Sequence, residues 1–582
     1  MNTEDRVSNY DKFPTIKVND SKSYFGYDSI GKEIDQQDKK TIVVDCYPRV
    51  DYEIVLGHLE KSLKPDHIII SDDVFYDGDK ITELTKALLT DDRVRGSMYY
   101  GFLEDFIDTN RLEEMKKRVK KIQESNEKIL VFGVGASLIT KGEVLVYADL
   151  ARWEIQLRYR KGMPNFKQKN NDEEILKKYK RGFFLEWRIS DKNKRKLFGV
   201  ADYWLDTNDS DNPVMISGET FNKALDTAAN RPFRVVPYFD PGVWGGQWMK
   251  EVCDLDREEE NFAWSFDGVP EENSLLFDID GNIVEFPAMN LTLGRPLELL
   301  GESVYARFGA EFPIRFDLLD TMGGQNLSLQ VHPTTDFIKN NYGMPYTQEE
   351  SYYLLDAEEN AKIYIGVRDD VNPTKMIDDL EKAARGEISF PEKEHINIVT
   401  TKKHDHFLIP PGTVHCSGGG TMVLEISASA YIFTFKLWDW DRLGLDGVPR
   451  PIHLEEGRQV INYNINETFA KNELINIFEP LETTPDYFTE KTGLHDLEFI
   501  QTNRHTFSGE ITIQTDNNVR MLNLVEGEEI VIESKTDEFE PFVVHYAETF
   551  IVPANVKEYT MKPYGLSENK EVKVLEAFVK KD

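Results

Sequence analysis

The sequence predicts a multidomain protein in which an α/β domain precedes an all-β region. From about Lys40 to Val200, apolar runs typical of strands alternate with helical patterns. From Phe233 to the C-terminus, short β-rich runs are separated by Gly and Pro, as in β-sandwiches and barrels. The length of 582 residues exceeds what one hydrophobic core can organise, and the 40% of hydrophobic residues favours folded domains over disorder.

The α/β domain is expected over residues 41–230, after a lead segment of residues 1–40. Residues 41–45, 67–70 and 129–132 are apolar runs of strand length. Before the third run, apolar residues recur at helical spacing among Lys and Glu, which predicts a helix lying on a sheet: Leu112, Met115, Val119 and Ile122. We therefore expect a three-layer α/β domain, which ends after a polar loop at residues 206–213.

Two segments of this domain could carry a ligand. Residues 131–137 follow a strand and contain Gly133 and Gly135, whose backbone could cradle a phosphate, but a tight turn after the strand is the favoured interpretation. Residues 147–154 either line a site or open an amphipathic helix. The sequence has no G-x-x-x-x-G-K-[ST] motif. A degenerate P-loop kinase-like fold that binds a nucleotide or a regulatory ligand stays open, and the role of the domain is unassigned.

Charge and cysteine content limit the partners and the compartment. The formal net charge of -34 repels polyanions, which argues against nucleic-acid binding, although a few local cations can still hold a phosphorylated substrate. The cysteines Cys46, Cys253 and Cys416 form no CxxC pair, which fits a reduced cytoplasm. Residues 1–23 lack the apolar core of a signal peptide, and no run approaches the ~20 apolar residues of a membrane span. We expect a cytoplasmic protein without membrane contact.

The all-β region contains one helical insertion and a faint internal repeat. Asn372 as N-cap, Pro373 in the first turn and Gly386 after the last turn predict the helix. Residues 407–415 resemble residues 550–558, which indicates two related β-lobes. The first repeat ends in a histidine and the second in a glutamate, so the second lobe is expected to be structural.

Three segments of the first lobe carry candidate metal ligands. Gln330 and His332 are two residues apart, a spacing that directs both side chains of a strand to one face. Glu350 precedes an aromatic strand, and His415 ends a P-x-G-x-x-H turn. Each could be an ordinary polar residue, but together they form an N/O donor set without thiolate that suits Zn, Mn, Fe or Co. The neighbouring Cys416 is expected to pack in the core.

A second histidine pair, His404 and His406, lies among charged residues at an expected turn. We therefore predict that both side chains of this pair are solvated rather than metal-binding.

Residues 231–581 resemble class I mannose-6-phosphate isomerase, a cupin family. The resemblance implies two cupin (jelly-roll) lobes, with a metal-binding catalytic domain at residues 231–490 and a C-terminal lobe without a metal site at residues 491–582. It also implies one divalent metal, zinc before manganese, cobalt or iron, held by the four candidate ligands above. The matching segments are collinear: 243–246, 299–302, 312–313, 327–333, the Glu350 segment, 409–415, Glu425 and 438–442.

The activity implied by this resemblance is an intramolecular oxidoreduction that interconverts mannose 6-phosphate and fructose 6-phosphate through a cis-enediolate. A metal stabilises the enediolate while a base moves a proton between C1 and C2. Lys436 is the candidate for substrate contact or proton transfer, and Glu425 for acid/base chemistry or hydroxyl binding. Arg442 is a candidate anion partner. Lys436 could instead extend out of a core strand, and Arg442 could pair with a nearby aspartate.

Three departures from the family pattern concern cations. Gln348 and Asp317 stand where members of the family commonly have lysine, and Lys436 stands where they often have arginine. The family's Q-Q-x-S-D pattern is replaced over residues 427–431. Because lysine and arginine bind phosphate differently, an isomerase of another sugar and a catalytically inactive sugar sensor stay open. A cupin dioxygenase has less support, since the first residue of its expected H-x-H is Gln330. The oligomeric state is not predicted.

Overall fold

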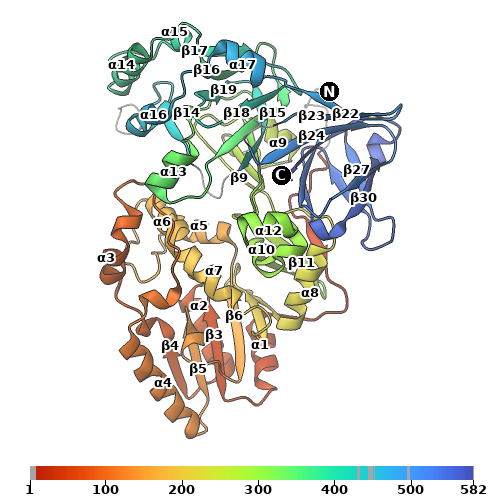
Figure 1. Cartoon of the computed structure of the whole chain (residues 1–582). Helices are drawn as coiled ribbons and strands as arrows, with labels where there is room; N and C mark the ends of the chain where they lie inside the picture. Colours follow the sequence, from red (N-terminus) through yellow and green to blue (C-terminus); the bar gives the residue numbers. More distant parts are fainter. Residues whose placement is uncertain (1–7, 429–432, 444–449, 451, 494–497, 581–582) are drawn as a thin grey trace. The chain divides into compact units, whose positions relative to one another are not determined.

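A computed structural model describes residues 8–428, 433–443, 450, 452–493 and 498–580 (Figure 1). The chain forms two compact units. An α/β unit comprises Thr15–Ala229 and Glu272–Arg295, and a β-rich unit comprises Met1–Pro14, Asn230–Glu271 and Pro296–Asp582. No helix in the described part of the chain has both the length and the apolar character of a membrane span.

The α/β unit is built on a seven-stranded sheet in the order β2-β8-β7-β6-β3-β5-β4. Five consecutive strands, β7, β6, β3, β5 and the edge strand β4, are parallel, and the inner four of these are buried, as expected of apolar strands covered by helices. Residues 41–45, 67–70 and 129–132 lie in three of them. The strands are β2 (Ser23–Phe25), β3 (Thr41–Cys46), β4 (His67–Ile70), β5 (Ile129–Gly133), β6 (Val144–Asp149), β7 (Tyr203–Asp206) and β8 (Val214–Ser217).

Helices connect these strands. Asp108 caps α4, whose residues include the predicted periodic positions, and a π-helical turn, Gly182–Glu186, joins α6 to α7. The helices are α1 (Gly26–Asp35), α2 (Tyr52–Leu63), α3 (Gly78–Leu89), α4 (Thr109–Glu124), α5 (Arg152–Arg160), α6 (Ile175–Arg181), α7 (Trp187–Arg195) and α8 (Gly218–Ala229). The returning segment adds β11 (Ser274–Ile279), β12 (Asn282–Pro287) and α10 (Met289–Gly294), and β11 pairs with β1 (Thr15–Lys17).

The first β-lobe consists of two sheets with antiparallel pairing, in the orders β18-β15-β20-β13-β10-β9 and β17-β16-β19-β14-β21. Apolar side chains of both sheets form its core, among them Val331, Tyr352 and Phe407. The strands are β9 (Tyr238–Asp240), β10 (Trp264–Gly268), β13 (Arg315–Asp320), β14 (Leu329–Val331), β15 (Glu349–Ala357), β16 (Lys362–Val367), β17 (Ile396–Thr400), β18 (His406–Ile409), β19 (His415–Ser417), β20 (Thr421–Ala428) and β21 (Phe435–Trp438).

Short helices connect the strands of the β-rich unit. Asn372 accepts a hydrogen bond from the backbone of Lys375 and so caps α14, which begins with Pro373 as predicted for the insertion. The helices are α9 (Trp248–Val252), α11 (Pro296–Leu300), α12 (Glu302–Phe308), α13 (Thr335–Tyr342), α14 (Pro373–Ala384), α15 (Glu392–His395), α16 (Leu454–Val460) and α17 (Glu467–Glu473).

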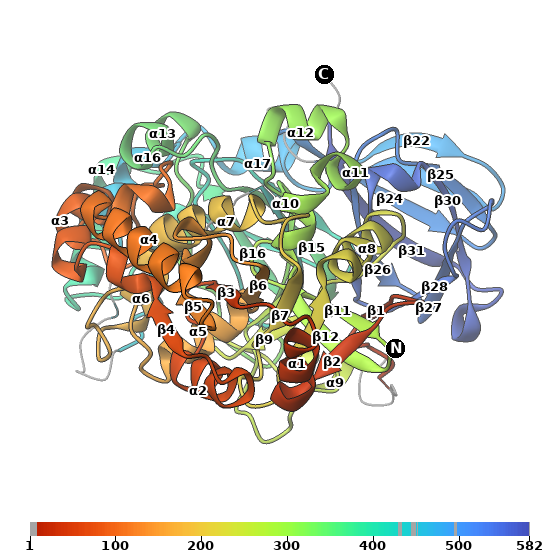
Figure 2. The same cartoon turned by 90° about the horizontal axis from the view of Figure 1, so that it is seen from below.

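The second β-lobe also has two sheets, β22-β23-β24-β31-β26-β29 and β25-β30-β27-β28, drawn in blue in Figure 2. Its core is a separate apolar cluster that includes Phe507, Leu522 and Tyr559. The strands are β22 (Glu479–Thr483), β23 (Tyr487–Lys491), β24 (Ile500–Phe507), β25 (Ile511–Gln514), β26 (Arg520–Glu526), β27 (Glu529–Glu533), β28 (Phe542–His545), β29 (Thr549–Val552), β30 (Glu558–Pro563) and β31 (Val572–Val579).

Candidate metal centre

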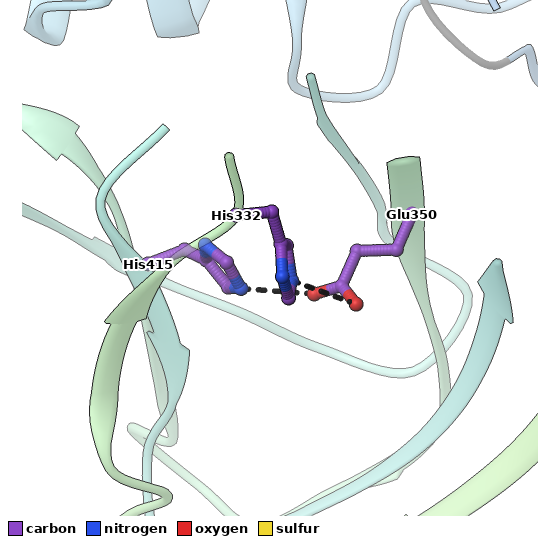
Figure 3. Close-up of side chains that lie close together, drawn as sticks. All are labelled: His332, Glu350 and His415. Atoms are coloured by element: carbon purple, nitrogen blue, oxygen red, sulfur yellow. Dashed lines mark ion pairs between the residues drawn. The ribbon is translucent and has the colours of Figure 1, made fainter. Parts of the chain in front are cut away.

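Two imidazoles and a carboxylate converge inside the first β-lobe. His332 Nε2 lies 3.1 Å from Glu350 Oε2, and His415 Nε2 lies 2.9 Å from Glu350 Oε1. Figure 3 shows the three side chains pointing toward one another. One ligand atom of each lies within 4.8 Å of the others, and all three residues are at most 1% exposed.

Strand pairing brings the fourth predicted ligand to the same place. Gln330 on β14 pairs with His415 on β19, and its Nε2 lies 3.2 Å from His415 Nε2. Rotation of the amide about its last bond would present the side-chain oxygen at this position instead. The structure therefore brings together all four residues that the sequence predicts as ligands.

Backbone carbonyls orient both histidines. The Nδ1 of His332 donates to the carbonyl of Phe433 at 3.0 Å, and the Nδ1 of His415 donates to the carbonyl of Thr413 at 2.9 Å. With the proton on Nδ1, each ring directs the lone pair of Nε2 toward Glu350, which is the arrangement of metal-binding histidines.

The electrostatics of the cluster suit a cation. Burial alone would lower the pKa of His332, but the negative charge of Glu350 outweighs it, and the pKa of His332 is raised. Burial alone would raise the pKa of Glu350, but His332 and His415 outweigh it, and the pKa of Glu350 is lowered well below its usual range. With both rings protonated on Nδ1, the 3.1 Å and 2.9 Å contacts of the cluster bring lone pairs together, so His332 Nε2 and Glu350 Oε1 are buried without a hydrogen bond among the described residues. Buried polar atoms are costly without partners, so these donors fit a bound divalent ion.

The chain is similar in sequence to known proteins. Over 345 residues the chain is 26% identical to Mannose-6-phosphate isomerase ManA of Bacillus subtilis (strain 168), covering 58% of this chain and 95% of that protein. Over 324 residues it is 23% identical to Mannose-6-phosphate isomerase of Streptococcus mutans, covering 54% and 90%. The predicted resemblance to mannose-6-phosphate isomerase is confirmed. Residues 26–230 match a different family, described as Domain of unknown function (DUF8485).

Solved structures of mannose 6-phosphate isomerases are also similar. The crystal structure of the Bacillus subtilis mannose 6-phosphate isomerase covers 60% of this chain and 99% of its own, with 18% identity and a TM-score of 0.48. A zinc-bound mannose 6-phosphate isomerase covers 60% and 100%, with 16% identity and a TM-score of 0.46.

A second carboxyl group, Glu425 on β20, lies beside the cluster of His332, Glu350 and His415. It pairs with Tyr352 on β15 and with Asp317 on β13, and its side chain shares a hydrogen bond with Glu350. Burial and the negative charges of Glu350 and Asp317 raise the pKa of Glu425 well above its usual range. A protonated carboxyl can donate a hydrogen bond or a proton, which a carboxylate cannot.

The other two predicted catalytic residues differ in their surroundings. Lys436 on β21 pairs with Gln330 on β14, so the half-buried lysine belongs to the strand next to the cluster. Arg442 Nη1 lies 2.7 Å from Asp439 Oδ1, and its Nε donates to Gln325 Oε1 at 3.2 Å. Arg442 thus makes the aspartate contact that the sequence left open, and its role as an anion partner stays a prediction.

Sequence reasoning missed the role of Gln348. It was noted only as a departure from lysine, whereas its Nε2 donates to Glu350 Oε2 at 3.0 Å and holds that carboxylate. Because Gln348 and Glu350 are two residues apart, strand periodicity could have placed them on one face. Residues 429–431 of the altered 427–431 segment lie outside the described residues.

The prediction of a solvated His404–His406 pair is wrong. His406 is fully buried, its Nε2 lies 2.9 Å from Ser351 Oγ, and burial lowers its pKa to about 3. His404 lies 2.9 Å from the Tyr353 hydroxyl and 3.0 Å from Glu526. His406 begins strand β18, so it points into the lobe despite its charged neighbours in sequence. Cys416 packs in the core as predicted.

In the α/β unit, the glycine run forms a tight turn, as the sequence favoured. The N–H groups of Gly135 and Ser137 both donate to the carboxylate of Asp45 at 3.0 Å, and Val134 N–H donates to the Tyr52 hydroxyl at 2.7 Å. The backbone donors that would cradle a phosphate are therefore used by the protein itself.

Residues 147–154 contain the end of β6 and the first residues of α5, so the segment opens a helix, and its lining of a site stays a prediction. Asp149 and Arg152 are buried rather than solvated. Asp149 lies 3.2 Å from Lys194, and Arg152 lies 2.5 Å from Asp191. These buried ion pairs join the end of β6 and the start of α5 to α7.

Proposed function

We propose that this chain is a metal-dependent aldose–ketose isomerase that interconverts mannose 6-phosphate and fructose 6-phosphate. The observation that carries the proposal is the convergence of His332, Glu350 and His415 with Gln330, in a region similar to curated mannose-6-phosphate isomerases. The domain at residues 231–490 would be a metal-binding cupin and the lobe at residues 491–582 a cupin without a metal. The α/β domain is given no catalytic role.

The four ligands would hold one divalent ion, with zinc as the first choice for two imidazoles and a carboxylate. A bound ion supplies a Lewis acid that stabilises negative charge on sugar oxygens. Glu425, whose pKa is raised by burial beside Glu350, can donate a proton to a sugar hydroxyl and take it back. Lys436, on the strand paired with Gln330, can contact the substrate or carry the C1–C2 proton of a cis-enediolate pathway.

The buried free thiols of Cys46, Cys253 and Cys416 support a reducing, cytoplasmic setting for this enzyme. Gln348 and Asp317, in place of lysines, favour isomerisation of another sugar as the second candidate, and a sensor without turnover as the third.

A coupled assay tests the proposal. The purified chain is stripped with a chelator, reloaded with zinc, manganese or cobalt, and assayed for fructose 6-phosphate formed from mannose 6-phosphate. Metal-dependent turnover is the expected result. Tight metal retention without turnover on this substrate would reject the mannose 6-phosphate assignment in favour of another sugar or a sensor. Stoichiometric metal in a His332→Ala variant would reject the ligand assignment.

A further inference from the structure

A buried guanidinium lies in the wall of the barrel beside the metal centre. Arg315 is the first residue of β13 and is 4% exposed. It pairs with Ser427 on β20, and Ser427 pairs in turn with Glu350 on β15. Directly paired residues of neighbouring strands project from the same face, so the three side chains form a row toward the cluster. Two strand spacings separate Arg315 from the ligand Glu350, roughly 10 Å between Cα atoms.

This row lies at one edge of the sheet. Arg315 and Glu350 are at the beginnings of their strands, and Ser427 is next to the end of the antiparallel β20. Arg315 and Glu350 therefore project from the same edge of the sheet, and not from opposite ends of the barrel.

The charge of Arg315 acts within the site. Its Nη2 lies 3.4 Å from Asp317 Oδ2, and Asp317 pairs with Glu425 on β20. A buried ion pair rarely contributes more to stability than apolar residues of the same volume. The pair of Arg315 and Asp317 is therefore better explained by a function than by stability.

Ser427 gives a second, independent indication of a ligand. It is 1% exposed, and its hydroxyl forms no hydrogen bond with any residue that the structure describes. Buried hydroxyls are normally satisfied, and this one lies between the guanidinium and Glu350 in the row. A hydroxyl and a guanidinium side by side are donors for an anionic oxygen.

We propose that Arg315 and Ser427 form the subsite that binds the phosphate of a sugar phosphate whose reacting carbons lie at the metal. This inference rests on the proposed function. The guanidinium of Arg315 supplies a local positive charge for an anionic substrate, although the chain as a whole has a net charge of -34. The sequence prediction that a cation is missing at Asp317 overlooked this arginine, two residues earlier on the same face of β13. The planar fork of arginine suits phosphate better than the point charge of lysine.

Equilibrium binding tests the subsite without requiring turnover. The zinc-loaded full chain and its variants are titrated with mannose 6-phosphate and with mannose by calorimetry, and zinc content is measured in parallel. Arg315→Met is expected to weaken mannose 6-phosphate binding by roughly 10- to 100-fold while leaving mannose binding and zinc content unchanged. Arg315→Lys should recover part of the loss. Ser427→Ala, a small change that preserves folding, should weaken only the phosphorylated sugar, by several-fold.

Arg520→Met is the matched control, because Arg520 is also a buried arginine but pairs with Asp516 and Glu576 in the second lobe. It should alter neither affinity. Equal binding of mannose and mannose 6-phosphate by the wild type, or unchanged selectivity in both Arg315→Met and Ser427→Ala, would overturn the subsite. Selective binding that these variants lose, in a chain without isomerase turnover, would retain the subsite and reject the proposed function.

Discussion

Gln348 donates a hydrogen bond from Nε2 to Oε2 of Glu350 at 3.0 Å, and its Oε1 accepts one from the backbone of Phe433 at 2.9 Å. The carbonyl of Phe433 in turn accepts from Nδ1 of His332 at 3.0 Å. One side chain and the backbone N–H and C=O of one residue therefore orient two of the candidate metal ligands. Partners of this kind fix ligand geometry and basicity in metal sites.

Replacement of Gln348 by leucine is expected to lower zinc affinity about 10- to 100-fold, because Glu350 loses the donor that fixes its carboxylate. Competition with a chromogenic chelator measures the affinity. Gln459→Leu, a change on the exposed face of α16, is the control and should bind zinc like the wild type. Equal affinity of Gln348→Leu and the control would mean that the carboxylate is held by the other contacts alone.

The residues of this centre differ in how far the sequence could reveal them. Gln330 and His332 followed from spacing, since two residues apart in a strand means one face. Glu350 and His415 were predicted as ligands from the P-x-G-x-x-H turn and the combined donor set, to which the family resemblance added weight. The link from Gln348 to Phe433 joins residues 85 positions apart, and no local pattern encodes such a contact.

In the fold as well, the sequence predicted elements that depend on neighbouring residues and missed pairings between segments far apart in the chain. Apolar runs predicted β3, β4 and β5, because a buried parallel strand is apolar along its whole length. The return of the chain to the α/β unit over Glu272–Arg295 had no local signal, since β11 pairs with β1, about 260 residues earlier in sequence. His406 was misjudged for a related reason: charged neighbours in sequence outweighed strand position.

Glu425→Gln is expected to reduce kcat about 100- to 10,000-fold while metal content stays the same, because an amide cannot transfer the proton that the carboxyl carries. Steady-state kinetics and metal analysis of the same preparation provide the test. Glu498→Gln changes another buried glutamate, in the second lobe, and should leave kcat unaltered. A Glu425→Gln enzyme with wild-type kcat would remove this residue from the proposed mechanism.

Lys436→Met is expected to lower kcat/KM at least tenfold, because Lys436 belongs to the strand that pairs with Gln330. Lys436 is only half-buried, so the melting temperature should fall by no more than a few degrees. Arg442→Met should lower the melting temperature and leave kcat/KM nearly unchanged, since Arg442 is held by Asp439 and Gln325. Thermal unfolding and kinetics of the two variants separate catalysis from stability. A greater loss of kcat/KM in Arg442→Met than in Lys436→Met would favour Arg442 as the anion partner.

Buried His406 should make the first lobe sensitive to acid. Its pKa is about 3 in the folded chain and about 6.5 when unfolded, so protons bind the unfolded state more tightly. The stabilisation from the neutral ring is complete above pH 6.5 and is lost as pH falls toward 3. At pH 5 the loss amounts to about 2 kcal/mol.

Urea unfolding at pH 7 and pH 5 measures this dependence. His406→Gln keeps a polar contact for Ser351 and should flatten the pH dependence by about the amount that the wild type loses. His67→Gln removes an exposed histidine and should keep the wild-type slope. The assignment fails if His406→Gln and the wild type lose equal stability between the two pH values.

The buried pair of Asp149 and Lys194 is expected to stabilise the α/β unit only as a pair. Lys194→Met leaves a carboxylate in a fully buried position and should cost about 3–5 kcal/mol. Asp149→Asn leaves the lysine without its closest partner and should cost a similar amount. The double variant removes both charges, keeps an oxygen to accept from Asn290, and should be more stable than either single variant.

Hydrogen exchange of peptides from β6 and α7 measures the opening free energy of this unit directly, without interference from the β-rich unit. Recovery of stability in the double variant would show that the penalty comes from an uncompensated charge and not from lost packing. Additive losses in the double variant would mean that each side chain stabilises the unit independently, through contacts such as that of Lys194 with the ring of Tyr47.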